Sequence, residues 1–521
     1  MKSTHLSLIA GAVALAAITG FASVNAPAGP AAEETATASS LPVERSSLVC
    51  PAPSGSDLAE TRYTSFTPPG TETGKGAGEG ADGTAELKPA LPVLDDDETE
   101  TETDPKKAKK AEEAAKKARA KADKPVIAVK EPGKPALVEA NGSGAPALVG
   151  TATGRLAPGW AAQQTTTVTV GGARGLLGVS CTAPDTDFWF PGASTARSRQ
   201  DYLHLTNPDD SAAVADIELF GPKGAVTSEV GDGITVPARS SIALLLSTLT
   251  DESVNDLTAH VTTRSGRVGA VVLTADDGSG TDWLTTATDP SATLVMPGIP
   301  SDATSVQLVA YAPGEHDADV KVQLMGENTT FAPAGNDTLH IKSGMTATID
   351  LKDITRGEPG SLRLTPVEKN RATPIVAALR VVRGTGAKQE YAYIPATGPV
   401  GARSSVTDNR AKGSTLSLAA PGATAKVKVT TSAGSGGGEP AVETYTVKAG
   451  TTMAVTPKPP AGLKGAYALT VETVSGGPVH ASRALLLPQD GVQMFTVQTL
   501  PDDGGTVVVP SARQDLSVLD D

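Results

Sequence analysis

The sequence predicts an all-β protein with three tandem antiparallel β-sandwich modules of the immunoglobulin-like class. A disordered or single-helix insertion is expected near the N-terminus. One set of sequence landmarks recurs three times at a spacing of about 105 residues, which is a domain-sized period. Aromatic residues make up only 3% of the chain, whereas 54 glycines and 39 prolines favour short strands joined by turns. Apolar and polar residues alternate within the recurring segments, as expected of strands with one buried and one solvated face.

Four landmarks define the repeat. The first is an apolar strand ending at proline, and the second is a strand with period-two alternation before a glycine. The third is a strand, a tight turn and another strand, and the fourth is a short apolar run such as residues 268–270. The tight turn contains Gly344 and Gly450 in the later copies, and both suit a positive φ. Because Arg239 stands there in the first copy, we expect that turn to differ or to be strained.

The landmarks place the three modules at residues 165–289, 290–397 and 398–510, followed by a tail at 511–521. The first module also needs N-terminal strands, which we assign to residues 43–68. The joins between modules are short and contain proline or glycine. This organisation predicts a semi-rigid rod of modules.

Residues 1–26 have the character of an export signal, and residues 27–42 are assigned to a linker. Lys2 and His5 precede an uncharged apolar stretch at residues 6–24. Cleavage sites after Ala22 or Ala26 are both imperfect, and the stretch is almost long enough to span a bilayer. A cleaved signal peptide and a retained signal anchor therefore both stay open. In either case we expect an exported protein, secreted or anchored at the outer face of the cytoplasmic membrane, that touches the membrane only through this segment.

The chain contains two cysteines, Cys50 and Cys181. An even number of cysteines in an exported protein predicts a disulfide bond. The wide separation of the two residues is unlike the C-x-x-C spacing of redox-active pairs. We therefore expect a structural disulfide.

Residues 69–164 are predicted to be a low-complexity, disordered insertion. An acidic block at residues 95–104 is followed by a lysine-rich and alanine-rich stretch, in which a charged helix is expected at about residues 105–124. All apolar positions of that helix are alanine, so it offers no face to a core. The segment is interpreted as a solvated spacer, with lysine contacts to anionic envelope polymers or lipid headgroups as the alternative.

The sequence predicts no catalytic, cofactor-binding or metal-binding residues, and we expect a protein that is not an enzyme. A net charge of −14 argues against nucleic-acid binding. The six histidines are scattered without the spacing of a metal pair, and no nucleophile elbow or phosphate-binding loop is present. The acidic segment at residues 275–283 suggests either a Ca²⁺ loop or a polar hairpin turn. The hairpin is favoured because the corresponding stretch of the second module lacks the acids.

Trp189 is the one residue with a candidate ligand-binding role. It lies in the sequence FWF close to Cys181. Packing against the disulfide is the favoured interpretation, and the alternative is an exposed platform for a glycan ring.

The leader, the sequence LVCPAP at residues 48–53 and the sequence SCTAPDTDFWFPG at residues 180–192 also carry a resemblance. Over most of its length the chain resembles domain-of-unknown-function family 5719, an uncharacterised family of secreted proteins from high-GC Gram-positive bacteria. The resemblance implies export. It brings no activity, cofactor or site residue with it.

Three functional hypotheses follow. The leading one is a non-catalytic protein of the cell envelope or extracellular space that acts as a scaffold, spacer or adhesive module. Its partner would be an envelope protein or polysaccharide. The alternative is an accessory protein that binds envelope polysaccharide, and the third hypothesis is an enzyme with a site between modules.

Overall fold

A computed structural model describes residues 39–70, 82–91, 116, 120, 122–228, 230–276 and 278–509. The chain divides into two compact units, of which the larger spans residues 42–506. The smaller unit combines residues 1–41 and 507–521, and its described part belongs to a two-stranded sheet of β1 (Ser39–Pro42) and β38 (Thr506–Val509). The export signal assigned to residues 1–26 lies outside the described residues. Among the described residues, no helix is long and apolar enough to cross a membrane.

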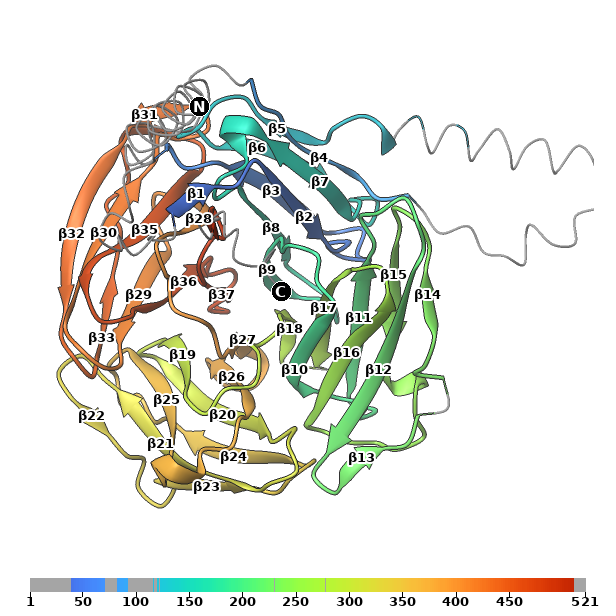
Figure 1. Cartoon of the computed structure of the whole chain (residues 1–521), viewed down its shortest axis with the longest axis vertical. Helices are drawn as coiled ribbons and strands as arrows, with labels where there is room; N and C mark the ends of the chain where they lie inside the picture. Colours follow the sequence, from blue (N-terminus) through green and yellow to red (C-terminus); the bar gives the residue numbers. More distant parts are fainter. Residues whose placement is uncertain are drawn as a thin grey trace, which may run out of the picture. The chain divides into compact units, whose positions relative to one another are not determined.

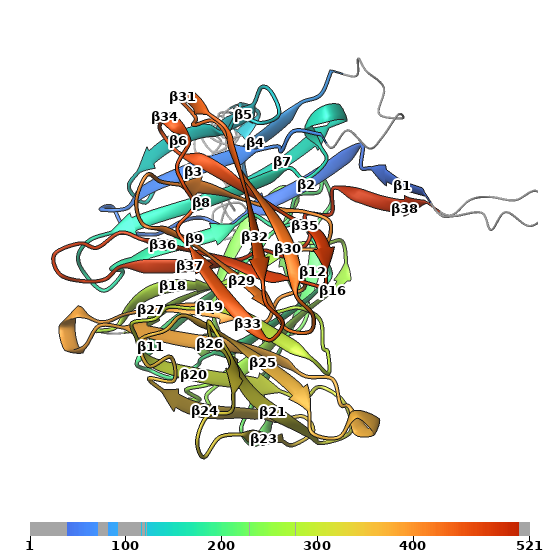
Figure 2. The same ribbon diagram turned by 90° about the vertical axis from the view of Figure 1, so that its left-hand side faces the viewer.

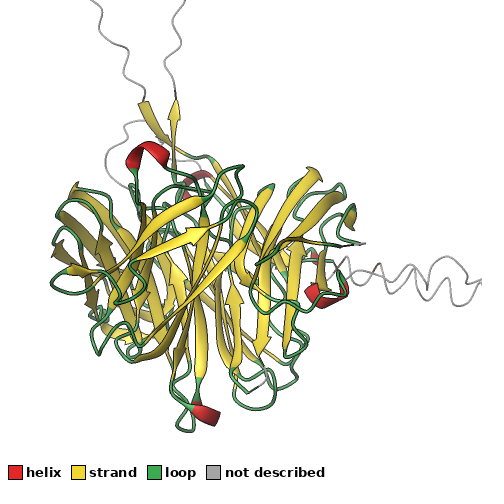
Figure 3. Cartoon of the chain, turned by 90° about the horizontal axis from the view of Figure 1, so that it is seen from below, coloured by secondary structure: helices red, strands yellow, loops and turns green. Residues whose placement is uncertain are grey.

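The prediction of an all-β protein is confirmed (Figure 3). Strands dominate the described residues, and the named helical elements are four 3-10 turns. These are η2 (Gly154–Leu156), η3 (Leu246–Thr248), η4 (Lys369–Arg371) and η5 (Gly386–Lys388).

The larger unit contains four β-sandwiches, numbered here in chain order and coloured from blue to red in Figure 1. Each sandwich consists of two antiparallel sheets that enclose their own cluster of buried apolar side chains. Sandwich 1 spans residues 45–180. Its first sheet has the order β2 (Arg45–Cys50), β7 (Leu148–Thr153), β4 (Ala85–Pro89), β5 (Ile127–Val129), and its second β6 (Ala136–Asn141), β3 (Glu60–Phe66), β8 (Ala161–Val168), β9 (Gly175–Ser180).

Sandwich 2 spans residues 187–284 and repeats this arrangement. Its first sheet contains β10 (Asp187–Ala193), β16 (Leu257–Ser265), β12 (Ala213–Gly221) and β13 (Gly224–Val226), with β14 (Ile234–Val236) also paired to β12. Its second sheet contains β15 (Ser241–Leu245), β11 (Arg199–Thr206), β17 (Gly269–Asp276) and β18 (Gly280–Leu284).

Sandwiches 3 and 4 span residues 294–395 and 404–499. The first sheet of sandwich 3 contains β19 (Leu294–Ile299), β25 (Gly360–Pro366), β21 (Ala318–Met325) and β22 (Thr330–Phe331), with β23 (Thr338–Ile341) also paired to β21. Its second sheet contains β24 (Thr346–Lys352), β20 (Ala303–Tyr311), β26 (Val376–Arg383) and β27 (Glu390–Pro395). The sheets of sandwich 4 are β28 (Ser404–Asn409), β35 (Tyr467–Gly476), β30 (Ala425–Thr431), β32 (Ala441–Val447), and β33 (Thr451–Val455), β29 (Ser414–Ala420), β36 (His480–Leu486), β37 (Phe495–Thr499). A separate pair is formed by β31 (Gly437–Glu439) and β34 (Ala461–Lys464).

The strand order differs from the immunoglobulin-like order that was predicted. In an immunoglobulin sandwich the first two strands share one sheet. Here the first strand pairs with a strand from the second half of its sandwich, and the second strand lies in the opposite sheet. The third strand pairs with a strand that soon follows it, as β12 does with β13, and the last two strands of each sandwich also pair directly, as β17 does with β18. The repeat was therefore visible in the sequence, but the pairing order was not.

The prediction of three modules is corrected to four. Residues 43–68 and the strands β8 and β9, most of which were assigned to the first predicted module, do not complete it, because they build sandwich 1 together with β4 to β7. Strands β4 to β7 fall within residues 69–164, which were predicted to be an insertion. The long charged stretch between β4 and β5 interrupts the period, and both strands are short, so local composition concealed them. Of the helix expected at about residues 105–124, the described residues Lys116, Ala120 and Ala122 have helical backbone, and most of the remainder lies outside the described part.

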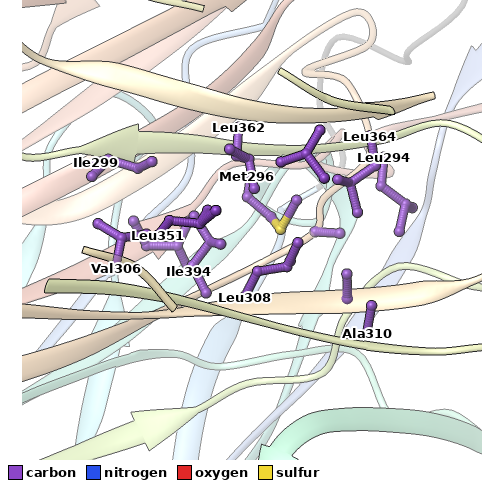
Figure 4. Close-up of a cluster of buried hydrophobic side chains, with 14 of the residues drawn as sticks. Leu294, Met296, Ile299, Val306, Leu308, Ala310, Leu351, Leu362, Leu364 and Ile394 are labelled. Carbon is purple, nitrogen blue, oxygen red and sulfur yellow. The ribbon is translucent and has the colours of Figure 1, made fainter. Parts of the chain in front are cut away.

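The core of sandwich 3 shows how the alternation builds these modules (Figure 4). Leu294 and Met296 on β19 and Leu362 on β25 face Leu308 on β20 and Ile394 on β27. All five side chains are almost fully buried. The alternate residues of the same strands point away from this core, so each sheet has a second face available for contact with a neighbouring sandwich.

The second faces pack the four sandwiches against one another. The final strands β9, β18, β27 and β37 contact one another in a closed cycle, and Figure 2 shows them side by side. Mixed apolar clusters join sandwich 1 to sandwich 2 through Val179 and Trp283, and sandwich 1 to sandwich 4 through Leu176 and Leu485. A semi-rigid rod would have no contact between its first and last modules, so that prediction is wrong. The outward faces carry enough apolar surface to bury against each other.

Candidate functional site

The predicted disulfide bond between Cys50 and Cys181 is confirmed. Cys50 ends β2 and Cys181 follows β9, so the bond links the two sheets of sandwich 1. The two Cα atoms lie 4.6 Å apart, and the bond closes a loop across a separation of 131 residues. Neither residue belongs to a C-x-x-C motif, and both are buried. This geometry suits a structural cross-link.

Trp189 is buried, with 7% of its surface exposed. Its ring stacks on His260 at a centroid distance of 3.6 Å and lies against Tyr311 of sandwich 3 at 5.7 Å. Trp189 therefore fills the junction between sandwiches 2 and 3 and does not pack on the disulfide. Its burial also removes it as an exposed glycan platform. Trp160 and Trp283 are buried as well.

Two buried carboxyl groups hold the final strands together. Asp282 on β18 accepts hydrogen bonds from the Tyr393 amide at 3.1 Å and the Thr496 hydroxyl at 3.2 Å, and so connects sandwiches 2, 3 and 4. Glu390 on β27 accepts a hydrogen bond from the Leu176 amide of sandwich 1 at 3.0 Å. Burial raises the pKa of Glu390 to about 7 and holds the pKa of Asp282 well above its usual range.

Raised carboxyl pKa values are typical of general acids, but a general acid must also reach its substrate. Glu390 is fully buried and Asp282 is 1% exposed. Their hydrogen-bond partners are backbone amides and a hydroxyl from neighbouring sandwiches, and Arg174 of sandwich 1 lies 3.9 Å from the Glu390 carboxylate. A substrate would have to separate the final strands to contact either group, so the arrangement suits a structural joint.

The described histidines and acids do not assemble a metal centre. Among the described residues, no group of three or more histidine, cysteine, aspartate or glutamate side chains has suitable geometry. His204 is buried, and burial lowers its pKa to about 4. In the acidic segment at residues 275–283, Asp276 pairs with Arg380 and Asp282 points to the final strands. These two acids therefore serve different partners.

The groove between sandwiches 1 and 2 is the strongest candidate for a ligand site. It has a volume of about 350 Å³ and lies between the outward face of the β2–β7–β4–β5 sheet and three turns of sandwich 2. Its charged lining residues are Arg45, Glu86, Lys88, Asp209, Asp210, Arg239 and Arg267.

Strand alternation delivers the sandwich 1 half of this groove. Leu87 on β4 faces the core of sandwich 1, whereas Glu86 and Lys88 point outward into the groove. On β2, Leu48 faces the core and Ser47 points outward. A polar and charged surface therefore covers the side of the sheet that meets sandwich 2.

The sandwich 2 half of the groove comes from turns at one end of the module. Asp209 follows β11, Arg239 lies between β14 and β15, and Arg267 lies between β16 and β17. The guanidinium of Arg267 donates two hydrogen bonds to the Asp209 carboxylate, both at 3.1 Å. This bidentate pair fixes one side of the groove.

Arg239 adopts a left-handed backbone conformation, with φ of 53°. The corresponding turns of sandwiches 1, 3 and 4 place Gly133, Gly344 and Gly450 there, with φ of 84°, 68° and 69°. In each of the four sandwiches, the backbone amide of this turn residue donates a hydrogen bond to a carbonyl at or just after the end of the second strand. The nitrogen–oxygen distances are 2.7 to 2.9 Å. The predicted strain at Arg239 is therefore confirmed, since an L residue with a Cβ disfavours this region.

The model of the family of unknown function DUF5719 matches residues 136–458 of the chain. The chain belongs to this family. The match includes all of sandwiches 2 and 3, and with them Asp209, Arg239 and Arg267 of the groove. No curated protein sequence matches the chain.

Because the function of this family is unknown, membership assigns no activity to the chain, and its function has to be inferred from its residues. Sequence reasoning missed the groove because its two halves lie far apart in the chain. Two signals did exist, namely the arginine at a glycine position of the repeat and Gly133, which lies about 105 residues before Arg239 and continues the period into sandwich 1.

Proposed function

We propose that this protein is an exported, non-catalytic scaffold of the cell envelope or extracellular space. Its four packed sandwiches hold binding surfaces in fixed positions for an envelope protein or polysaccharide. The Cys50–Cys181 bond supports this placement, since disulfides persist in oxidising compartments outside the cytoplasm. The apolar stretch at residues 6–24 supplies an export signal or anchor in this proposal.

The observation that carries the scaffold role is the use of strongly perturbed acids as joints between sandwiches. Asp282 and Glu390 are buried and bonded to groups of other sandwiches. Asp201 likewise pairs with Arg199 at 2.6 Å, and Arg199 donates a hydrogen bond to Tyr393 of sandwich 3 at 2.8 Å. Buried, hydrogen-bonded polar networks rigidify the elements that they join.

The two other hypotheses have less support. An inter-module enzyme site would need converging reactive groups that a substrate can reach. Asp282 and Glu390, the perturbed acids that meet at the final strands, are buried instead. The hypothesis of a polysaccharide-binding accessory protein relied on an exposed aromatic platform, but all three tryptophans are buried.

Localisation and thiol state test this proposal together. The full chain would be expressed with its own N-terminus in a Gram-positive host, and intact cells would be treated with protease and with a thiol-alkylating reagent. We expect cleavage by external protease, and alkylation of Cys50 and Cys181 only after reduction. A variant that lacks residues 1–38 is the control and should stay inside the cell. Protease-protected full-length protein with free thiols would contradict the proposal, and surface crosslinking on intact cells would identify the partner and the mature N-terminus.

A further inference from the structure

We propose that the groove between sandwiches 1 and 2 binds an acidic polysaccharide, with the Arg239 guanidinium contacting its anionic group. The inference deepens the proposed function, because such a polymer would be met outside the cell. The chemistry of the groove can be tested with purified protein, independently of where the cell places it.

The backbone of Arg239 provides the first argument. Three equivalent turns use glycine at this position, and each makes the same amide hydrogen bond that Arg239 makes to Asp209. The Arg239 carbonyl also accepts a hydrogen bond from the Leu91 amide at 2.7 Å, and a glycine carbonyl would serve equally. The turn itself therefore gains nothing from a side chain and is strained by its Cβ. The presence of an arginine at this glycine position must therefore be explained by its guanidinium group.

Contacts within the described protein do not account for the guanidinium. Its acidic neighbours are Asp123 at 3.8 Å and Asp210 at 3.9 Å. Their side chains are 69% and 94% exposed, so both contacts are long and solvated. Ion pairs of this kind contribute little to stability. Strained residues that local packing does not explain are concentrated at binding sites.

The remaining lining indicates the class of ligand. Arg45, Lys88 and Arg267 line the groove beside Arg239, with Lys88 3.8 Å from Glu86 and Arg267 paired with Asp209. Glu86 and Asp210 offer acceptors for hydroxyl groups. Ser47 on β2, Thr151 on β7 and Thr84 just before β4 add hydroxyls. A densely charged polyphosphate would be repelled by the carboxylates, and a lipid or apolar peptide would find little apolar surface.

A saccharide that bears carboxylate groups and free hydroxyls complements both kinds of lining. Its carboxylates can accept paired hydrogen bonds from an arginine fork, and its hydroxyls can donate to the groove acids. The groove volume of about 350 Å³ also falls within the range of small-ligand sites, about 300–1,000 Å³. The geometry therefore favours a short segment of a uronic acid polymer.

The experiment is calorimetric titration of the purified, disulfide-bonded full chain with oligogalacturonate and with hyaluronan hexasaccharide. A neutral dextran oligosaccharide and poly(glycerol phosphate) of similar length are the comparison ligands. We expect binding of at least one uronic acid oligosaccharide, weakened by added salt, and no binding of dextran. Stronger binding of poly(glycerol phosphate), or no binding of either uronic acid ligand, would overturn the proposal.

The variants Arg239→Gly and Arg356→Gly sharpen the test. Arg239→Gly installs the residue of the other three turns, and we expect at least a tenfold loss of affinity with no loss of thermal stability. Arg356 is a matched control because it is an exposed arginine of sandwich 3, also with a positive φ of 49°. Arg356→Gly removes the same charge and the same kind of strain away from the groove, so affinity should not change. Equal losses in both variants would show a general charge effect and reject the site.

Failure of this test can be told apart from failure of the proposed scaffold role. The binding experiment uses purified protein, whereas the scaffold proposal depends on protease access and thiol state at the cell surface. Binding in solution with a cytoplasmic location would reject the scaffold placement alone. A surface location without uronic acid binding would reject the groove assignment alone.

Discussion

The junction between sandwiches 2 and 3 and the junction between sandwiches 1 and 2 share a backbone plan but differ in filling. Trp189 and Val49 hold equivalent places on the first strand, because each forms a bridge to the segment after the last strand of its own sandwich, at Ala287 and Thr182. In the neighbouring strand, Trp189 pairs with His260, whereas Val49 pairs with a valine, Val149. One junction is sealed by stacked rings, and the other leaves a groove.

The difference teaches that side-chain size on one outward row decides whether a junction of this fold is structural or open to ligand. These residues form a row across three strands, and its third member is Glu218, paired with His260, in sandwich 2 and Lys88, paired with Val149, in sandwich 1. Large aromatic side chains bury area and exclude water from the first junction. At the second junction Val49 is also buried, but the charged strand ends and turns of sandwiches 1 and 2 line a groove.

The largest expected effect concerns the covalent link beside the open junction. Cys50 follows Val49 on β2, so the disulfide holds the strand that lacks aromatic filling. We expect the double variant Cys50→Ser with Cys181→Ser to lose about 5 kcal/mol of unfolding free energy, the loop-closure effect for so long a loop. Denaturant titration measures the loss. A reductant should shift the wild-type midpoint and leave that of the variant unchanged, and a variant as stable as oxidised wild type would contradict this role.

Removing the aromatic seal should have the next largest effect. Trp189→Ala leaves Tyr311 and His260 without their central partner, and we expect a loss of about 4 kcal/mol. Val49→Ala at the equivalent place is the matched variant and should cost only about 1.5 kcal/mol. Thermal and denaturant unfolding measure both. Equal losses at the two positions would break the comparison between a sealed and an open junction.

At a third contact, between sandwiches 1 and 3, the buried carboxyl group of Glu390 takes the place of aromatic side chains. Burial raises the pKa of Glu390 from 4.5 to about 7, so the folded state keeps a proton that the unfolded chain releases between these pH values. This group therefore contributes stability that is full below about pH 4.5 and is lost as pH rises through 7. Glu390→Gln should remove up to about 3 kcal/mol of this pH dependence.

Unfolding midpoints between pH 4.5 and pH 8 measure this slope. Glu358→Gln, at an exposed position of sandwich 3, is the control and should keep the wild-type slope. Burial raises the pKa of Asp201 to about 6 and also raises that of Asp282, so some slope in the same direction should remain in Glu390→Gln. An unchanged slope in Glu390→Gln would contradict the assignment of this joint.

The smallest expected effect belongs to the groove itself. Arg239→Gly relieves a left-handed backbone position and should raise the unfolding free energy by about 1 kcal/mol. The reverse substitution in sandwich 3, Gly344→Arg, should lower it by a similar amount. Differential scanning calorimetry measures both shifts. If Arg239→Gly were destabilised, the guanidinium would have a structural role. The junction between sandwiches 1 and 2 would then also be held together by a side chain, like the junction between sandwiches 2 and 3.

Local sequence patterns predicted much of this structure. Alternation identified the strands of sandwiches 2, 3 and 4, because the half-buried face of a strand is written into a few neighbouring residues. Comparison of repeat copies exposed Arg239, since backbone sterics act within a single residue. The pairing of Cys50 with Cys181 followed from having two cysteines in a chain that was predicted to be exported. The candidate site was predicted only in fragments, because Arg239 was noticed for its backbone and Lys88 was assigned to an insertion.

The tertiary structure decided the rest. It alone showed that β4 and β5 belong with β7 in a fourth sandwich, that the final strands close a cycle, and that Trp189 is buried where sandwich 3 meets sandwich 2. These features depend on pairing and shape complementarity between surfaces far apart in the chain, and no local period encodes them. The sequence by itself determined the strands, the repeat and the cross-link, while the groove exists only because two distant faces fail to fill the space between them.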